Sequence, residues 1–385
     1  MNTQKICIIG GSLSGLVTAL SLSKYNCSID LIINNTKQGN NSSSTIAVSQ
    51  NNLDFFNKIK ILKRPNFFLW PCSMMKLYIS KKEKISEIFE YNNEKKIKKI
   101  LYMFKSSELK KLMLDKIKKT KSIKIRNVKK ITKIYNNGLL KGIKVKKSFF
   151  NYNLIILCTG SNSNLVKDVF KGEFIKNSYG ESAITTILKH KKIKNNTARQ
   201  IFLDDEIFAL LPISNSQTSI VWSVKKSNSK SSEILKEKIK SYSKFFLKDI
   251  KFISSIEHRN LNFLIRNEYF KDRVLLFGDA LHEIHPFVGQ GFNMTLRDLD
   301  SLEKILKKKL NLGLDIGSHD ILSEFSKKTK PGNLAFSLAT DVLKNSFAIK
   351  NKYFKKVRNT FLRKINDNKL IKDIFFGVAD KGFKF

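Results

Sequence analysis

The chain has 385 residues, 42% of them apolar and only 5 of them proline, which argues against a disordered or proline-rich chain and allows about two or three globular domains. Its 72 lysines and arginines outnumber 32 acidic residues and give a formal net charge of +40. The lysines are scattered, and no arginine-rich or aromatic-interleaved stretch occurs. We therefore interpret them as a solvated surface and expect no nucleic-acid partner.

The N-terminal segment predicts a βαβ unit. KICII (5–9) is a short apolar run that ends in two glycines, apolar residues at helical spacing follow over 16–25, and a second apolar run covers 29–33. The two runs indicate a buried pair of parallel strands. The next segment, 35–45, is rich in Asn, Ser and Gly and is predicted to be a surface loop.

The following part of the chain predicts one helix and several strands. A serine and a glutamate open the segment 106–119, and its apolar residues share one helical face. Strand-like runs follow at 123–134 and 143–150. The segment 151–160 is typical of a buried strand that ends at a glycine.

Later segments alternate between antiparallel and parallel signatures. The runs 208–214 and 219–225 predict an antiparallel hairpin, 273–280 is typical of a buried strand, and a helical pattern begins at about residue 290. We predict an α/β fold in which a Rossmann-like βαβ domain is interleaved with a smaller antiparallel-sheet domain and followed by a helical C-terminus. The predicted bounds are 1–75, 100–175 and 266–335 for the first domain, 76–99 and 176–265 for the second, and 336–385 for the C-terminal helices.

The first glycine-rich turn is a candidate phosphate site. In GGSLSG (10–15) a tight turn joins a strand to a helix, so that the backbone can approach a pyrophosphate and the helix N-terminus offers free N–H groups. Alone the motif is weak, because Ser12 replaces the middle glycine of GxGxxG. Ile33 or Asn34 stands where a ribose-binding acid is expected, so a purely structural turn remains an alternative.

The second motif, GDALHEIHPFVGQGFN (278–293), is more specific. An aspartate follows a buried strand, and a proline and a Gly-Gln-Gly turn then open a helix. This order suits a carboxylate that holds a polyol chain and a helix N-terminus that faces a ring carrying negative charge. We interpret His282 and His285 as packing or hydrogen-bonding residues rather than as a general acid or base.

The two motifs resemble those of the flavoprotein hydroxylases that share the para-hydroxybenzoate hydroxylase fold, and more closely those of the ubiquinone-biosynthesis hydroxylase family. The resemblance covers nearly the whole chain. STIAVS (44–49) is similar to the family's RTxALS segment, 202–223 to its FLPxGPLALLPL…SxVWS stretch, and ATDVLKNSF (339–347) to its C-terminal helix pattern.

This resemblance implies that the first domain binds FAD and that the protein hydroxylates the aromatic ring of a polyprenylated phenol with O2, using NAD(P)H or a protein electron donor as reductant. Because the cofactor performs the chemistry, no catalytic side chain and no metal ligand is predicted. Asp279 would bond the ribityl chain, Gly10 and Gly15 would frame the pyrophosphate, and the 286–293 segment would border the isoalloxazine ring. The expected cofactor-binding residues are Gly10, Gly11, Ser12, Gly15, Asn34, Asp279, Pro286, Gly289, Gln290, Gly291 and Asn293.

The chain departs from the family pattern at charged positions. Ser44 replaces the arginine of RTxALS, and Ile33 and Asn34 stand in place of the acid after the second strand. In the family's ADGxxSxxR fingerprint, Thr159 replaces the aspartate and Val166 the arginine. A lost charged contact costs about 1.5 to 3 kcal/mol. Since that fingerprint is tied in the family to nicotinamide and flavin together, the reductant is the least determined part of this prediction.

The segment 351–370 is predicted to be an amphipathic helix. Such a helix either rests on an anionic membrane or packs on its own domain; packing is favoured, and membrane contact is kept as a hypothesis. Its apolar face comprises Phe354, Val357, Phe361 and Ile365, with Lys355, Lys356, Arg358, Arg363 and Lys364 elsewhere.

Two other functions stay open: a flavin-dependent isoprenoid or quinone reductase, and a non-catalytic membrane-associated subunit that has lost flavin. The four cysteines form no CxxC pair, and no apolar stretch reaches the ~18 to 20 residues of a membrane-spanning helix. We expect a cytoplasmic protein, with peripheral attachment to the inner membrane or to a biosynthetic complex as a hypothesis.

Overall fold

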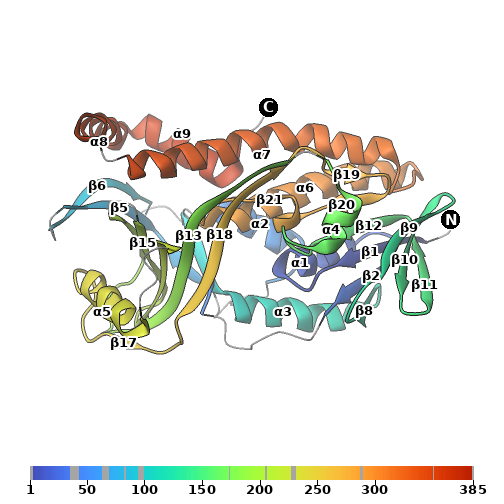
Figure 1. Cartoon of the computed structure of the whole chain (residues 1–385), viewed down its shortest axis with the longest axis horizontal. Coiled ribbons are helices and arrows are strands. Elements are labelled where there is room, and N and C mark those ends of the chain that lie inside the picture. Colours follow the sequence, from blue (N-terminus) through green and yellow to red (C-terminus); the bar gives the residue numbers. More distant parts are fainter. Residues whose placement is uncertain are drawn as a thin grey trace.

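Two large sheets and a layer of long helices make up most of the molecule (Figure 1). The computed structural model describes residues 3–34, 43–62, 69–81, 84–93, 99–172, 174–203, 206–226, 231–286, 289–349 and 351–383. The first sheet is Rossmann-like, the second is mostly antiparallel, and their strands alternate along the chain. The predicted fold class is confirmed.

The first sheet is parallel apart from one edge strand. Its order is β19-β20-β12-β1-β2-β8, and α1 joins β1 to β2 as the predicted βαβ unit. Its inner strands are apolar on both faces because helices cover the sheet, so the strands predicted at 5–9, 29–33, 151–160 and 273–280 are confirmed. The elements are β1 (Gln4–Ile9), α1 (Leu13–Leu22), β2 (Cys27–Ile33), β8 (Ile123–Asn127), β12 (Leu154–Leu157), β19 (Phe270–Lys271) and β20 (Val274–Leu276).

The order of strand addition reverses at β1. The strands β2 and β8 extend the sheet on one side of β1, and β12 and β20 extend it on the other. In open α/β sheets, ligands bind at the carboxyl ends of the strands at such a switch point. Gly10 follows β1 there with φ +134°, and a Cβ at this position would lie 2.3 Å from the Cys158 carbonyl oxygen. A Cβ on Gly15 would lie 2.0 Å from the Gly10 oxygen, so both positions require glycine.

The second sheet has nine strands among the described residues and is antiparallel except where β5 runs parallel to β14. Its order is β21-β18-β13-β16-β15-β14-β5-β6, with β17 paired to β13. The hairpin predicted over 208–214 and 219–225 is formed by β15 and β16. The strands are β5 (Met74–Lys81), β6 (Lys84–Asn92), β13 (Phe174–Lys189), β14 (Thr197–Leu203), β15 (Glu206–Ser214), β16 (Gln217–Lys225), β17 (Lys251–Phe252), β18 (Glu257–Arg266) and β21 (His282–Glu283).

Two small antiparallel sheets complete the strands of the described chain. One contains β3 (Thr45–Ser49), β4 (Trp70–Cys72) and β7 (Leu101–Lys105); the other contains β9 (Lys133–Asn137), β10 (Leu140–Val145) and β11 (Ser148–Tyr152). The run predicted over 123–134 is therefore divided, because β8 joins the parallel sheet and β9 begins a separate one. Most of the loop predicted at 35–45 lies outside the described residues.

Helices cover both sheets. The predicted helices at 106–119 and from about 290 are α3 and α6, and a 3₁₀ turn, η3, follows β20. The helices before residue 312 are α2 (Gln50–Lys58), α3 (Ser106–Lys118), α4 (Asn164–Val169), α5 (Ser232–Ser243) and α6 (Gln290–Asn311), and η3 covers Gly278–Ala280.

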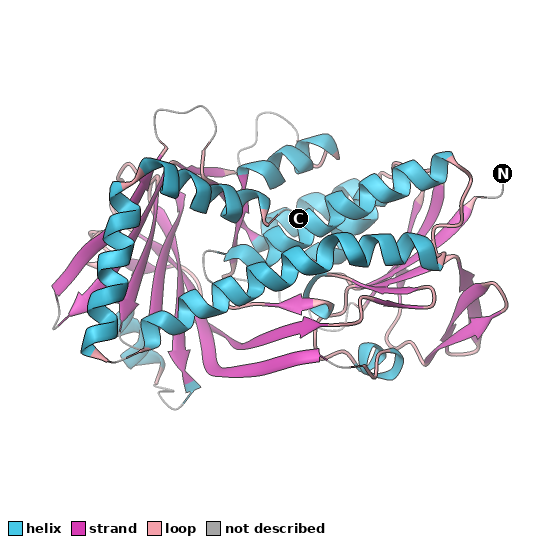
Figure 2. Cartoon of the chain, turned by 90° about the horizontal axis from the view of Figure 1, so that it is seen from above, coloured by secondary structure: helices cyan, strands magenta, loops and turns pink. Residues whose placement is uncertain are grey.

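Three C-terminal helices, α7 (His319–Ala348), α8 (Lys352–Asp367) and α9 (Lys369–Lys381), lie along the top of the molecule in Figure 1, and Figure 2 looks down on them. The prediction that the amphipathic segment packs on its own domain is wrong for most of its face. Ile365 is buried, but Phe354, Val357 and Phe361 are exposed. No helix of the described chain is long and apolar enough to cross a membrane. The predicted domain bounds stay a proposal, and α7 is continuous through residue 336.

Candidate functional site

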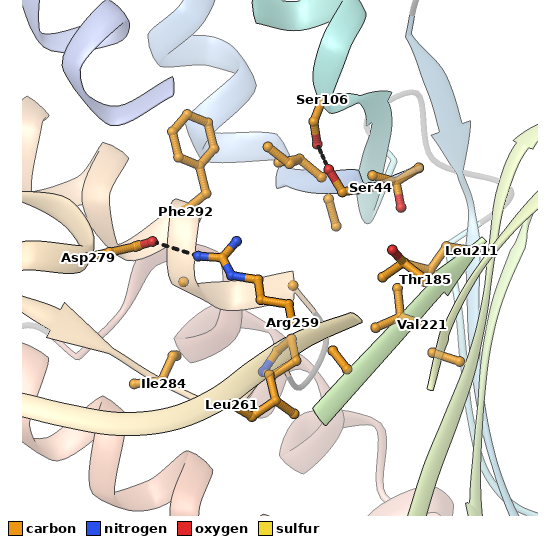
Figure 3. A pocket seen from close by; sticks show the side chains of 18 of the residues that line it. Ser44, Ser106, Thr185, Leu211, Val221, Arg259, Leu261, Asp279, Ile284 and Phe292 are labelled. Atoms are coloured by element: carbon orange, nitrogen blue, oxygen red, sulfur yellow. Dashed lines mark hydrogen bonds and ion pairs between the residues drawn. The ribbon is translucent and has the colours of Figure 1, made fainter. Parts of the chain in front are cut away.

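A cavity of about 500 Å³ lies between the parallel sheet and the nine-stranded sheet. Ligand pockets in proteins usually measure roughly 300 to 1,000 Å³, so this cavity is in the size range of pockets that bind drug-sized molecules. Ser12 and Ser14 line it from the first glycine turn, and Asp279 and Gly291 line it from the second motif. The two motifs therefore meet at one cavity. Figure 3 shows Asp279 and Phe292 of the second motif at its wall.

The two motifs also touch directly. A Cβ at Gly278 would lie 2.7 Å from the Ser14 hydroxyl oxygen, and Gly278 has φ +62°, so this residue lets η3 approach the start of α1. Ser12 is the N-cap residue of α1, and its hydroxyl donates to the Cys158 carbonyl at 3.4 Å rather than capping the helix. The N-terminus of α1 is therefore left with backbone N–H groups that no described side chain caps.

Asp279 is paired with a residue that the sequence did not indicate. Its carboxylate accepts a hydrogen bond from Arg259 on β18 at 3.2 Å, and Figure 3 shows the guanidinium pointing across the cavity toward it. The Asp279 side chain is 47% exposed, so its second oxygen is open to a ligand. Arg259 brings a positive charge to the cavity wall although Ser44 has replaced the family's arginine.

The start of α6 is open toward the cavity. Gly289 has φ +66° and serves as the N-cap, where a Cβ would meet that of Ala47 at 3.0 Å. No described side chain caps this helix end, so free N–H groups and a partial positive charge face outward. A Cβ on Gly291 would meet nothing within 4 Å, and the buried Oε1 of Gln290 has no hydrogen-bond partner among the described residues. Pro286 lines the cavity beside them.

Asn293 supports this helix end from inside the protein. Its Nδ2 donates to the Ala47 carbonyl at 2.8 Å, while its Oδ1 accepts from the Ser49 N–H at 3.0 Å and from Asn52 Nδ2 at 2.8 Å. The side chain is fully buried and does not line the cavity. These bonds fix α6 against β3, so the structure gives Asn293 a positioning role.

The remaining predicted residues lie at the ends of β1 and β2. Gly11 follows Gly10 in the turn, and Asn34 directly follows β2, where its Nδ2 donates to the Lys129 carbonyl at 3.0 Å. Neither residue lines the cavity. Both stand at the carboxyl edge of the sheet, on the side that the glycine turn faces.

The opposite wall of the cavity is one face of the nine-stranded sheet. A cross-strand row runs over five strands from β18 to β14, and alternate residues of each strand point to this face. The other face carries large residues such as Trp222 and Phe208, which pack with α5. The row consists of Glu257, Thr185, Val221, Ala209 and Gln200, all of which line the cavity.

At the positions that depart from the family pattern, the side chains either hydrogen-bond to a neighbour or have no hydrogen-bond partner among the described residues. The Ser44 hydroxyl donates to that of Ser106 at 2.9 Å at the cavity wall. Val166 is fully buried in α4. Thr159 Oγ1 is buried and has no hydrogen-bond partner among the described residues. Among the described residues, the structure therefore shows no charged side chain that takes the place of the family's aspartate at 159 or of its arginine at 166.

Both histidines of the second motif are buried and hydrogen-bonded, as predicted. His282 Nε2 lies 2.8 Å from Asp298 of α6. His285 Nε2 lies 3.3 Å from Glu181 Oε2, and Lys344 donates to the other Glu181 oxygen at 2.6 Å. Burial lowers the pKa of His285, so it is neutral at pH 7 and donates from Nε2. Burial opposes ionisation of Glu181, but the bonds from His285 and Lys344 outweigh it and lower its pKa.

A parallel sheet with a glycine turn at its switch point, facing a second sheet across a cavity, defines a dinucleotide-binding protein. Residues 3–313 match the model of the FAD binding domain family, so the chain belongs to this family and FAD is its cofactor.

Curated relatives match parts of the chain. A ubiquinone hydroxylase UbiL from Rhodospirillum rubrum is 29% identical over 181 residues, which are 44% of this chain and 41% of the relative. The mitochondrial ubiquinone biosynthesis monooxygenase COQ6 of Dictyostelium discoideum is 27% identical over 278 residues, 59% of this chain and 55% of the relative. The chain thus spans about half the length of these relatives.

Solved structures share the fold over the whole length. The p-nitrophenol 4-monooxygenase PnpA from Pseudomonas putida DLL-E4 has a TM-score of 0.80 at 14% identity, covering 100% of this chain and 99% of that one. HpxO from Klebsiella pneumoniae, solved with FAD and uric acid, has a TM-score of 0.77 at 15% identity, covering 98% and 96%. At these identities the likeness shows the fold alone.

Proposed function

We propose that the protein is an FAD-dependent monooxygenase that hydroxylates the aromatic ring of a polyprenylated phenol in ubiquinone biosynthesis. The observation that carries this proposal is the shared cavity, in which the glycine turn, Asp279 and the start of α6 face one surface of the nine-stranded sheet. The names of the matched relatives support the reaction class and the pathway.

The residues around the cavity fit FAD. Glycine at 10 and 15, with the uncapped start of α1, suits a pyrophosphate, and Asp279 suits the hydroxyls of a ribityl chain. The start of α6 suits the ring, because Gly291 lines the cavity with open space beside it and no described side chain caps this helix end; Gln290 is buried and does not line the cavity. The proposed cofactor set is completed by Gly11, Ser12, Asn34, Pro286 and Gly289, and Asn293 positions the start of α6 without contacting the cavity.

When bound and reduced, FAD supplies the activation of O2: one oxygen atom enters the ring, the other leaves as water, and NAD(P)H or a protein donor provides two electrons. The chain's own groups position the reactants. With FAD bound, the N-terminus of α6 would stabilise negative charge on the flavin ring, and apolar lining residues such as Met75, Leu211 and Phe292 would keep water from the ring.

The nine-stranded sheet would hold the phenol. Ala209 and Val221 leave room for a planar ring against the sheet, while Thr185 and Glu257 offer polar atoms in the same row. The Glu257 carboxylate already accepts from the Ser43 N–H at 2.7 Å, which fixes its orientation toward the cavity edge. A carboxylate held in this way is suited to accept the phenolic O–H.

The test is a hydroxylation assay with a short-chain prenylated phenol and labelled dioxygen. The protein is purified, its flavin absorbance recorded, and the product analysed by mass spectrometry after addition of NADH, NADPH or a reduced ferredoxin-type donor. We expect a yellow protein and one labelled oxygen atom in the product. Reductant consumption without labelled product would point to a reductase, and a colourless protein that takes up no FAD would point to a subunit without flavin.

Asp279→Ala tests the cofactor site itself. Loss of hydrogen bonds to a charged group costs about 1.5 to 3 kcal/mol, so FAD affinity should fall about tenfold or more. Asp300→Ala is the matched control, because Asp300 is also a paired aspartate on the surface but lies on α6 away from the cavity. Fluorescence titration of the apoprotein measures both, and equal affinities would contradict the proposed site.

A further inference from the structure

Six large apolar side chains among the described residues of the three C-terminal helices are at least 61% exposed. We call them the C-terminal apolar surface, and the three helices that carry them lie on the side of the molecule that Figure 2 views from above. On α8 they follow one another at intervals of four residues, which places them in one stripe along the helix. The set is Val342 (67% exposed), Tyr353 (83%), Val357 (67%), Phe361 (61%), Leu370 (76%) and Ile374 (67%).

The other sides of α8 and α9 are anchored on the protein. Ile365 is buried, and Asn366 Oδ1 accepts from the Glu90 N–H at 2.9 Å. Arg358 lies over the Phe347 ring, 4.4 Å from its centroid, and Phe376 of α9 stacks on Tyr91 of β6 at 3.6 Å between ring centroids. The helices are therefore held in an orientation that points the C-terminal apolar surface away from the core.

Basic side chains accompany this surface. The helix α8, KYFKKVRNTFLRKIND, has six basic residues and one acidic residue. On a helical projection Lys356 and Arg363 border the stripe on one side and Lys364 lies within it, and all three are exposed. An apolar stripe among cations is the pattern of a helix that lies in the interface of an anionic lipid layer.

The cavity lies close to the same helices. Met75 lines the cavity and also belongs to the apolar cluster that contains Phe347 of α7 and Ile365 of α8. The inner side of α8 and the cavity wall thus share one apolar cluster. For a substrate with a polyprenyl chain, which is part of the proposed function, docking by this surface would place the cavity near the bilayer.

We propose that the C-terminal apolar surface docks the protein on an anionic lipid bilayer. The apolar stripe enters the headgroup boundary, and the cations of α8 bind lipid phosphates. Exposed apolar surfaces of this kind on a folded chain mark interaction sites. The positive charge of α8 favours an anionic partner, and a bilayer of anionic lipids combines such charge with an apolar interior.

The test compares two double variants by co-sedimentation with vesicles of phosphatidylcholine, with or without phosphatidylglycerol. V357D/F361D places two negative charges in the stripe. L139D/L312D makes the same chemical change at two exposed leucines, 83% and 66% accessible, outside the C-terminal helices. Flavin absorbance and thermal unfolding confirm that both variants are folded.

We expect the unchanged protein to bind the anionic vesicles and to release them as salt is raised. V357D/F361D should bind at least about tenfold more weakly, because burial of two such side chains is lost, and L139D/L312D should bind like the parent. Equal binding by the two variants, or no binding by the parent, overturns the proposal. A dimer that only V357D/F361D dissociates, measured by light scattering, overturns it in favour of a second copy. Vesicle binding needs no turnover, so its outcome is independent of the hydroxylation assay.

Discussion

At Gly291, the stability of helix α6 and the space in the cavity favour different residues. It lies in the first turn of α6, where glycine weakens a helix, yet it borders the cavity, and a Cβ added there would have no neighbouring atom within 4 Å. Folding alone therefore does not require glycine here. The proposed FAD site gives a reason for glycine, because a ring bound there needs the space that a side chain would fill.

Gly291→Ala should fold normally and bind FAD poorly. The added methyl group meets no protein atom, so the free energy of unfolding should stay level or rise by up to about 1 kcal/mol. In the bound state it would crowd the ring, at a cost of about 1 to 3 kcal/mol, which is roughly tenfold or more in Kd. Thermal unfolding of the apoprotein and fluorescence titration with FAD separate the two effects.

The matched control is Gly377→Ala in α9, another helical glycine with nothing within 4 Å and no role at the cavity. It should show the same stability change with unchanged FAD affinity. A normal FAD affinity for Gly291→Ala would place the flavin ring elsewhere.

At the scale of single residues, the sequence predicted site residues that belong to local motifs but not their partners from distant segments. Gly10, Gly15 and Asp279 belong to local motifs, and the structure brings these motifs to one edge of the sheet, where Ser12, Ser14 and Asp279 line one cavity. Arg259 gave no signal, because it lies twenty residues from Asp279 on a strand of a different sheet. The cross-strand row gave no signal of its own, because its register depends on pairing that no local pattern encodes.

At the scale of elements, the buried group of Glu181, His285 and Lys344 connects β13, the second motif and α7. Its bonds hold the segment that leads to Pro286 against the long helix. Because the folded state keeps His285 neutral and Glu181 ionised, this connection should weaken in acid.

The sign follows from proton binding. Burial lowers the pKa of His285 from 6.5 in the folded state. Below about pH 6.5 the unfolded chain therefore binds a proton that the folded chain does not, and the free energy of unfolding decreases as the pH is lowered. The lowered pKa of Glu181 adds a further loss below about pH 4.5, as its carboxylate is protonated. Urea unfolding of the parent should therefore show decreasing stability from pH 7.5 to 5.5.

His285→Gln should reduce this loss, since an amide does not titrate, although the variant is less stable overall at pH 7.5. His319→Gln is the control, because His319 is exposed at the start of α7 and should leave the pH dependence unchanged. Identical pH dependence in the parent and His285→Gln would show that another group controls it.

Elements with strong local periodicity were predicted correctly. The βαβ unit, α3, the β15–β16 hairpin and α6 each combine one clear period with a turn or helix-start signal. The segment 351–370 was predicted to pack because its apolar face is regular, yet three of its four residues are exposed. A periodic pattern reports that a face is apolar, not whether protein or lipid covers it.

At the scale of the whole molecule, the alternation of strand types predicted two interleaved sheets, but not their relative placement. That placement makes the cavity, because β18 and β13 bring the second sheet against the turn after β20. The charge of the chain gave a similar partial answer. A net charge of +40 spread over the sequence pointed to a solvated surface, whereas the exposed stripe on α8 is visible only once the helices are placed.

The shared cavity makes a prediction for hydrogen exchange of the entire chain. FAD added to the apoprotein should slow exchange in two separate segments, the turn at 10–16 and the start of α6 at 289–293, because both face the same ligand. The separate three-stranded sheet at 133–152 should not respond to FAD. A phenol analogue added to the FAD complex should then protect β14 and β15, whose small residues form the opposite wall. Protection of only one of the two FAD segments would mean that they do not hold one ligand, and the site would have to be divided.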